Sequence, residues 1–258
     1  MLASGGDRQE LVSEIQKLLE IIKGNVIEPQ MKTVDGKEWQ YLDYIGADIL
    51  YSQTRGEFRL ALPNYIEKAA KRFNIQPVDT DKWLSPNFSE ERLLAPNQKE
   101  VPNYPYRTIV GMLQWASTVC RPDIAVAASV LGRYCSQVPT KSMVQASKKV
   151  LRYLLATKDV GLEYTKENEK RFHDIYSKLM PDGEKLPKVS IFSDAGFANQ
   201  VKTMHSTSGS IAYLHGVPVF WRSSRQGVRA YSTAESEYIA CSDTIIISES
   251  NNCLDFFS

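Results

Sequence analysis

The chain has 258 residues, of which 43% are apolar and 24% are charged, enough for one large domain or two small ones. No apolar run is long enough to cross a membrane, and the first residues lack the charged-then-apolar pattern of a signal peptide. The sequence therefore predicts an intracellular protein, of cytoplasm or nucleus, that is not secreted and has no membrane partner.

The first 75 residues predict a strand-rich α+β unit. Apolar side chains recur at helical spacing over residues 7–22, which indicates an amphipathic helix. A second helix is expected over residues 64–73. Between them, β-type residues and an Asp35-Gly36 turn predict strands. The expected strands are 31–34, 39–52 and 58–62.

A proline-rich connection and three helices are expected next. Residues 76–105 contain five of the twelve prolines, which predicts an extended, irregular segment. The first helix is predicted over residues 107–119. The second begins at Pro122, and the third follows Thr140, which is suited to cap it.

Basic residues are concentrated in the middle of the chain, although the net charge is only +1. Residues 107–158 hold eight Lys and Arg against one acid, and residues 195–230 hold four and no acid. A polyanion would therefore contact this part of the chain. One face of the third helix gathers Lys141, Lys148, Lys149 and Arg152. That face is either simply solvated or contacts phosphates, and the pattern leaves both open.

Residues 161–164 predict a strand, and the polar residues 165–187 predict a mobile surface loop. A second α+β pattern follows over residues 188–246. It consists of a strand carrying Asp194, a hairpin with its turn at His215-Gly216, and a helix that begins with the capping-box sequence Ser232-Thr-Ala-Glu235.

Two carboxylates in this second pattern form a candidate metal site. Glu235 is explained as part of the helix cap, whereas Glu237 borders the apolar stripe expected to pack on the sheet and has no such role. Asp194 near the strand end is its natural partner, and two hard carboxylates suit Mg²⁺. The expected apolar stripe consists of Ala234, Tyr238, Cys241 and Ile245.

The sequence gives little support for other kinds of catalytic or metal site. The three histidines and four cysteines show no metal-ligand spacing, and neither a nucleophile elbow nor a phosphate-binding glycine loop is present. Trp221, Arg222 and Arg225 lie together at the end of a strand. They would either stack on and hold a nucleic-acid backbone or cover the edge of the sheet.

Several ordered motifs resemble the Pol polyproteins of copia-type LTR retrotransposons. Those after residue 188 resemble the family's ribonuclease H domain, and those before it resemble the segment that joins reverse transcriptase to ribonuclease H. The matching residues are 106–113, 121–124, 151–154, 193–198, 206–209, 221–226 and 232–238.

The resemblance implies three regions: a reverse transcriptase palm/thumb remnant (1–75), a Pro-rich connector with helices (76–158), and the N-terminal part of a ribonuclease H-like domain (159–258). The parent protein copies RNA into DNA and degrades the RNA strand of RNA–DNA hybrids with Mg²⁺. The implied partner is an RNA–DNA hybrid or duplex, bound in a salt-sensitive way, through the basic residues Lys141, Lys148, Lys149, Arg152, Arg222 and Arg225.

The same resemblance predicts that this chain is inactive alone. Ribonuclease H chemistry in the family uses two metal ions and about four carboxylates, of which Asp194 and Glu237 are present. Gly196 and Phe197 depart from the family pattern, and the chain is expected to be truncated at both ends. The alternative is a non-catalytic nucleic-acid-binding or degenerate remnant that has no ligand.

Overall fold

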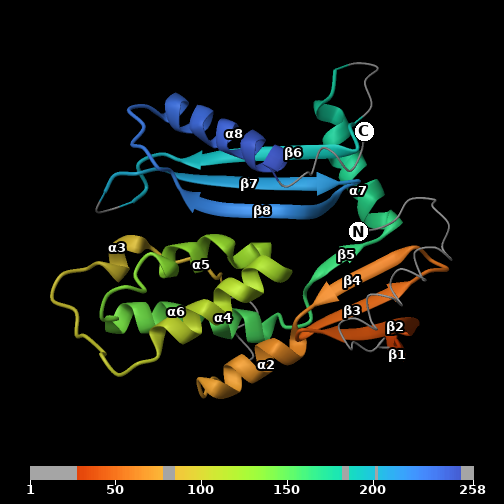
Figure 1. Ribbon diagram of the computed structural model, residues 1–258, viewed down its shortest axis with the longest axis horizontal. Coiled ribbons are helices and arrows are strands. Elements are labelled where there is room, and N and C mark those ends of the chain that lie inside the picture. Colours follow the sequence, from red (N-terminus) through yellow and green to blue (C-terminus); the bar gives the residue numbers. More distant parts are fainter. Residues whose placement is uncertain (1–27, 78–84, 182–185, 201–202, 251–258) are drawn as a thin grey trace, which may run out of the picture.

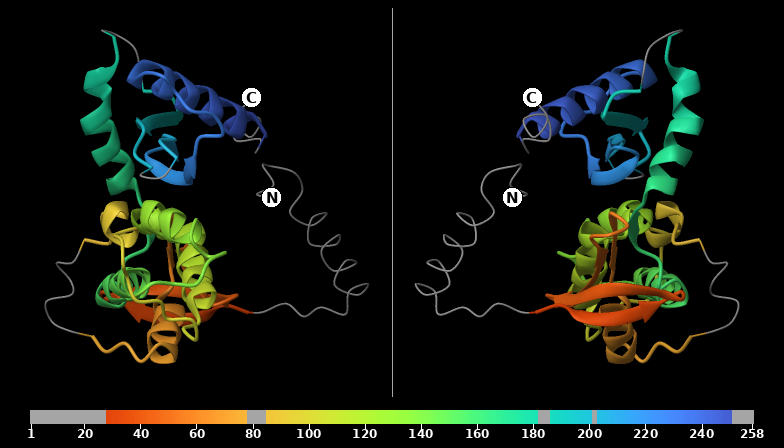
Figure 2. Two further views of the ribbon diagram at one scale, coloured as in Figure 1. Left: turned by 90° about the vertical axis from the view of Figure 1, so that its left-hand side faces the viewer. Right: turned by 90° about the vertical axis from the view of Figure 1, so that its right-hand side faces the viewer.

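The computed structural model describes residues 28–77, 85–181, 186–200 and 203–250, and only the backbone of 247–250. The helix predicted over residues 7–22 lies outside this part of the chain. The described residues form a five-stranded sheet, a group of helices, and a three-stranded sheet (Figure 1). In Figure 2 the three-stranded sheet lies between helix α8 (Thr233–Ser250) and the group of helices. This mixture of helices and sheets confirms the α+β class.

The five-stranded sheet is antiparallel throughout, in the order β1-β2-β3-β4-β5. Ile45 and Gly46 both have positive φ angles and form a tight turn. This turn divides the single strand predicted over residues 39–52 into two, so that prediction was wrong. The strands are β1 (Gln30–Val34), β2 (Lys37–Tyr44), β3 (Ala47–Ser52), β4 (Glu57–Ala61) and β5 (Leu162–Tyr164).

Strand β5 comes from a distant part of the chain and joins the sheet beside β4. Gly161, just before it, approaches β4 so closely that an added Cβ would lie 2.1 Å from the carbonyl oxygen of Leu60. A glycine is therefore required where the chain enters this sheet.

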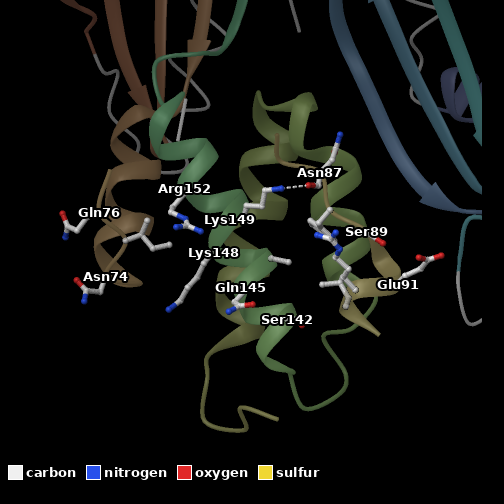
Figure 3. A pocket seen from close by; sticks show the side chains of 15 residues that line it. Asn74, Gln76, Asn87, Ser89, Glu91, Ser142, Gln145, Lys148, Lys149 and Arg152 are labelled. Atoms are coloured by element: carbon white, nitrogen blue, oxygen red, sulfur yellow. Dashed lines mark hydrogen bonds between the residues drawn. The ribbon is translucent and has the colours of Figure 1, made fainter. Parts of the chain in front are cut away.

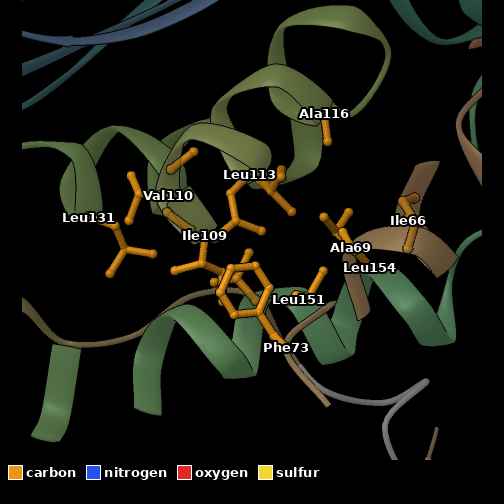
Figure 4. Packing of buried hydrophobic residues seen from close by; sticks show 14 of the residues in the cluster. Ile66, Ala69, Phe73, Ile109, Val110, Leu113, Ala116, Leu131, Leu151 and Leu154 are labelled. Carbon is orange, nitrogen blue, oxygen red and sulfur yellow. The ribbon is translucent and has the colours of Figure 1, made fainter. Parts of the chain in front are cut away.

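The group of helices contains the main hydrophobic core. The three helices predicted after residue 106 are confirmed, and Thr140 caps the third by accepting a hydrogen bond from the Met143 amide at 3.4 Å. Ile66, Ile109 and Leu151 are among the buried side chains that pack together between them (Figure 4). The elements are α2 (Pro63–Arg72), α3 (Glu90–Leu93), α4 (Tyr106–Val119), η2 (Pro122–Ile124), α5 (Ala125–Gly132) and α6 (Lys141–Ala156).

Residues 165–187 do not form the predicted loop. Most of this segment is helical, as α7 (Lys166–Tyr176) and η3 (Ser177–Leu179), and the Thr165 side chain caps α7. Phe172 of α7 is buried in an aromatic cluster, where its ring centroid lies 4.9 Å from that of Tyr213 and 6.5 Å from that of Phe192. One well-placed aromatic residue thus attaches an otherwise polar helix to the three-stranded sheet.

The three-stranded sheet consists of β6 (Val189–Gly196), β7 (Thr207–Leu214) and β8 (Val217–Arg225), all antiparallel. The predicted hairpin turn is confirmed, because His215 and Gly216 both have positive φ angles. The Ser232 hydroxyl accepts from the Glu235 amide, as a helix cap should, whereas the Glu235 carboxylate accepts from the Tyr231 amide instead of that of Ser232.

The predicted inner face of α8 is wrong. Ala234, Tyr238, Cys241 and Ile245 are all exposed, Tyr238 to 78%. The buried face instead consists of Ser236, Ala240 and Thr244. The Thr244 hydroxyl lies 2.5 Å from that of Ser210 on β7. Small side chains face each other because the helix packs closely on a strand of small residues, so the large apolar side chains point outward.

None of the described helices is long and apolar enough to span a bilayer.

Candidate functional site

Asp194 is exposed near the end of β6, on the face of the sheet that α8 does not cover. Residues directly opposite each other in an antiparallel pair share a face, and Ser193 is paired with Ser210, which contacts α8. Its neighbour Asp194 therefore points to the other face, toward η2 and α5. There it lines a shallow, largely apolar groove of about 270 Å³ together with Pro122 and Val126.

Glu237 lies in the second turn of α8 and is half-buried. It follows Ser236, which faces the sheet, and so borders the buried face of the helix, although this face is not the apolar stripe beside which it was predicted to lie. Asp194 and Glu237 thus belong to one sheet-and-helix unit but lie on different sides of the sheet. Their joint role as metal ligands stays a prediction.

The described residues contain no group of three or more His, Cys, Asp or Glu side chains that could hold a metal ion. The carboxylates in this part of the chain therefore do not fit the two-ion site that the resemblance implies.

Three of the four predicted basic residues of α6 line one open groove, which we call the α6 groove (Figure 3). Lys148, Lys149 and Arg152 are joined there by Arg92 of α3, and Glu91 supplies the one carboxylate among the described lining residues. The groove has a volume of about 1040 Å³. Lys141 is exposed at the start of α6 and is not among the lining residues.

Contacts with the protein hold part of this positive charge in place. The Lys149 ammonium donates a hydrogen bond of 2.8 Å to the Asn87 carbonyl, and that of Lys148 lies 5.4 Å from the centre of the Tyr104 ring. The Nε of Arg152 is buried and has no hydrogen-bond partner among the described residues. No ion pair with a described acid neutralises these three cations, so the groove attracts anions.

The three residues predicted as a cluster at the end of β8, Trp221, Arg222 and Arg225, have two different roles. The Trp221 indole donates a hydrogen bond of 2.7 Å to the Ser117 carbonyl of α4, so this ring attaches the sheet to the group of helices. Arg222 and Arg225 are exposed and remain available for a ligand. For Trp221 this hydrogen bond favours the alternative of a structural role at the sheet over stacking on nucleic acid.

Sequence reasoning missed two arginines that the fold brings to these sites. Arg92 joins the α6 groove from a short helix outside the basic segments, and Arg133 lies beside Arg225. Arg133 was part of the charge excess, but no sequence pattern distinguishes it from the other basic residues. Only the packing of α5 against the three-stranded sheet brings Arg133 next to Arg225.

No family model matches the chain, and no solved structure matches it significantly. Among curated proteins, the secreted RxLR effector protein 161 of Plasmopara viticola is 37% identical over 55% of this chain and 87% of its own length. The retrovirus-related Pol polyprotein from transposon TNT 1-94 of Nicotiana tabacum is 28% identical over 92% of this chain, and that from transposon RE1 of Arabidopsis thaliana is 31% identical over 72%.

The chain spans 17% of the length of the first of these polyproteins and 11% of the second. The similarity to both extends over most of this chain. The chain belongs to the Pol polyproteins of copia-type retrotransposons.

Proposed function

We propose that this chain is the nucleic-acid-binding part of a reverse transcriptase and ribonuclease H in a retroelement Pol polyprotein. In this proposal the five-stranded sheet derives from the palm and thumb, the group of helices forms the connection, and the three-stranded sheet with α8 belongs to a ribonuclease H-like domain. Asp194 and Glu237 would contribute to a Mg²⁺ site only together with further carboxylates, which the described residues do not provide.

The observation that supports binding is the α6 groove. Among the described residues, four cations and one carboxylate line it, and its open form suits an extended anion better than a small molecule. Phosphates of an RNA–DNA hybrid or duplex supply such a polyanion, and Lys and Arg contacts to them depend strongly on salt because binding releases counterions. The groove itself carries no information on base sequence, so we expect affinity without sequence preference.

The test is a salt titration of the binding of a fluorescently labelled RNA–DNA hybrid, followed by anisotropy. With three to four phosphate contacts, the affinity should fall about 40- to 150-fold between roughly 50 and 200 mM salt. No affinity at the lower salt concentration, or an affinity that salt does not change, would support the alternative of a folded chain with no ligand.

Hybrid cleavage by this chain alone is expected to be absent in Mg²⁺ or Mn²⁺. The reason is the lack of any group of three potential metal ligands among the described residues, whereas a two-ion mechanism needs ligands for both ions. Gel analysis of a labelled hybrid after incubation with the wild-type chain measures this. Turnover that the substitution Asp194→Asn abolishes would contradict the expectation and would show that fewer carboxylates suffice.

A further inference from the structure

A second, smaller pocket lies where the three-stranded sheet packs against α4 and α5. We call it the junction pocket; its volume is about 380 Å³. Two contacts fix its walls. The Trp221 indole donates to the Ser117 carbonyl at 2.7 Å, and the Arg133 guanidinium donates to the Thr207 hydroxyl at 3.1 Å. The pocket therefore has a defined shape, formed jointly by the three-stranded sheet and the group of helices.

The lining of the junction pocket consists largely of hydrogen-bond donors. Arg133, Arg222 and Arg225 supply three guanidinium groups, and Ser129 and Ser223 add hydroxyl groups. No carboxylate is among its lining residues within the described part of the chain. Planar guanidinium groups with hydroxyls around them match the several acceptor oxygens of a phosphate group better than a neutral or cationic ligand.

The positive charge in this pocket is only partly compensated. Arg133 forms an ion pair of 3.6 Å with Glu90, but its Nε is buried and has no hydrogen-bond partner among the described residues. Its side chain is 17% exposed, so the charge is held in a partly dehydrated position. Arg222 and Arg225 are exposed and form no ion pair with any described acid. An anion would thus meet one fixed and two adaptable guanidinium groups.

The pocket is also in register with Asp194. Gly209 is paired with Asp194 on one side and with Ser223 on the other, so Asp194 and Ser223 lie on the same face two strands apart. Two strand spacings amount to about 10 Å. A strand that crosses this face at Asp194 would therefore reach the junction pocket about 10 Å further along.

We propose that the junction pocket binds a phosphodiester group of a nucleic-acid strand that crosses the sheet beside Asp194. This inference rests on the proposed function, because it takes the strand to be that of the bound hybrid or duplex. The junction pocket would be a second contact point for the nucleic acid, built by residues of the three-stranded sheet and of the group of helices. It would fix where the backbone lies relative to Asp194. Arg133, Arg225 and Ser223 are the residues that hold the phosphate.

The substitution Arg225→Gln tests the inference, because this arginine is exposed and forms no ion pair with a described acid whose loss would disturb the fold. Removing one phosphate contact should lower the slope of log affinity against log salt by about 0.9 and weaken hybrid binding about eightfold at roughly 0.1 M salt. Arg225→Lys should keep the slope. Arg171→Gln, which removes an exposed arginine of α7, is the matched control and should bind like the wild type.

The outcomes separate the two proposals. Absence of hybrid binding by the wild-type chain would overturn the proposed function and this inference together. Wild-type binding with an unchanged slope for Arg225→Gln would overturn this inference alone. Competition by inorganic phosphate at constant ionic strength distinguishes the source of the ligand. Release of the hybrid by about millimolar phosphate would identify free phosphate as the ligand and overturn the phosphodiester assignment.

Discussion

Replacing Arg121 with methionine is expected to lower the free energy of unfolding by about 3–5 kcal/mol. Arg121 is completely buried between η2 and α6. Its guanidinium donates two hydrogen bonds to the Asp123 carboxylate, at 2.9 and 2.7 Å, and two more to the carbonyl and hydroxyl oxygens of Thr157, at 2.9 and 2.7 Å. Methionine fills similar space but removes all four of these hydrogen bonds and leaves Asp123 with only the Tyr153 hydroxyl as donor, which is far more destabilising than losing a surface ion pair.

The matched control is Arg55→Met in the turn between β3 and β4. Arg55 also forms several hydrogen bonds, to Glu57 and to the Glu38 carbonyl, but its side chain is 31% exposed. Water can replace those bonds, so the loss should stay within about 1 kcal/mol. Urea unfolding of both variants measures the difference. An equal loss in the free energy of unfolding for both variants would show that burial does not decide how much these hydrogen bonds contribute.

The same network makes stability depend on acid pH. Burial alone would raise the pKa of Asp123, but the hydrogen bonds and charge of Arg121, with the hydroxyl of Tyr153, hold that pKa below its ordinary value. A carboxyl whose pKa is lower in the folded state stabilises the fold above its unfolded pKa, about 4, and loses this contribution as the pH falls through the lowered value. We expect the Arg121→Met variant to show a smaller loss of stability between about pH 5 and pH 2 than the wild type.

The sequence was most informative where local signals agree with tertiary packing. Helix α6 combines a capping threonine with a clear apolar face, and its predicted start after Thr140 agrees with the structure. Helix α8 shows the opposite case. Its apolar residues lie on several sides, and its sheet-facing side was set by the small residues of β7, which periodicity alone does not reveal.

The candidate sites could be predicted only in part, for a related reason. Helical spacing placed Lys148, Lys149 and Arg152 on one face, but whether that face borders a groove depends on α3, which packs there from an earlier part of the chain. The face of Asp194 depends on which side of the sheet α8 covers, and no local pattern determines this. Local sequence patterns also cannot predict contacts that form only when α5 packs on the three-stranded sheet, such as those of Arg133.

Removing the three cations of α6 from its groove is expected to have the largest effect on nucleic-acid binding. If each side chain contacts one phosphate, the combined substitution Lys148→Gln, Lys149→Gln and Arg152→Gln lowers log affinity by about 2.7 at roughly 0.1 M salt, or about 500-fold, and lowers the salt slope by the same 2.7. Glutamine keeps most of the side-chain length, so packing along α6 changes little. Anisotropy with the labelled hybrid over a range of salt concentrations gives both quantities.

The control for this variant removes the same charge from another helix. Lys166, Lys170 and Arg171 are exposed on α7, and none of them lines the α6 groove or the junction pocket. Their replacement by glutamine changes net charge equally, so a purely long-range attraction would weaken binding by the same factor in both variants. A loss confined to the α6 variant, with its thermal unfolding unchanged, would identify the groove as the contact surface, whereas equal losses would leave only the overall charge.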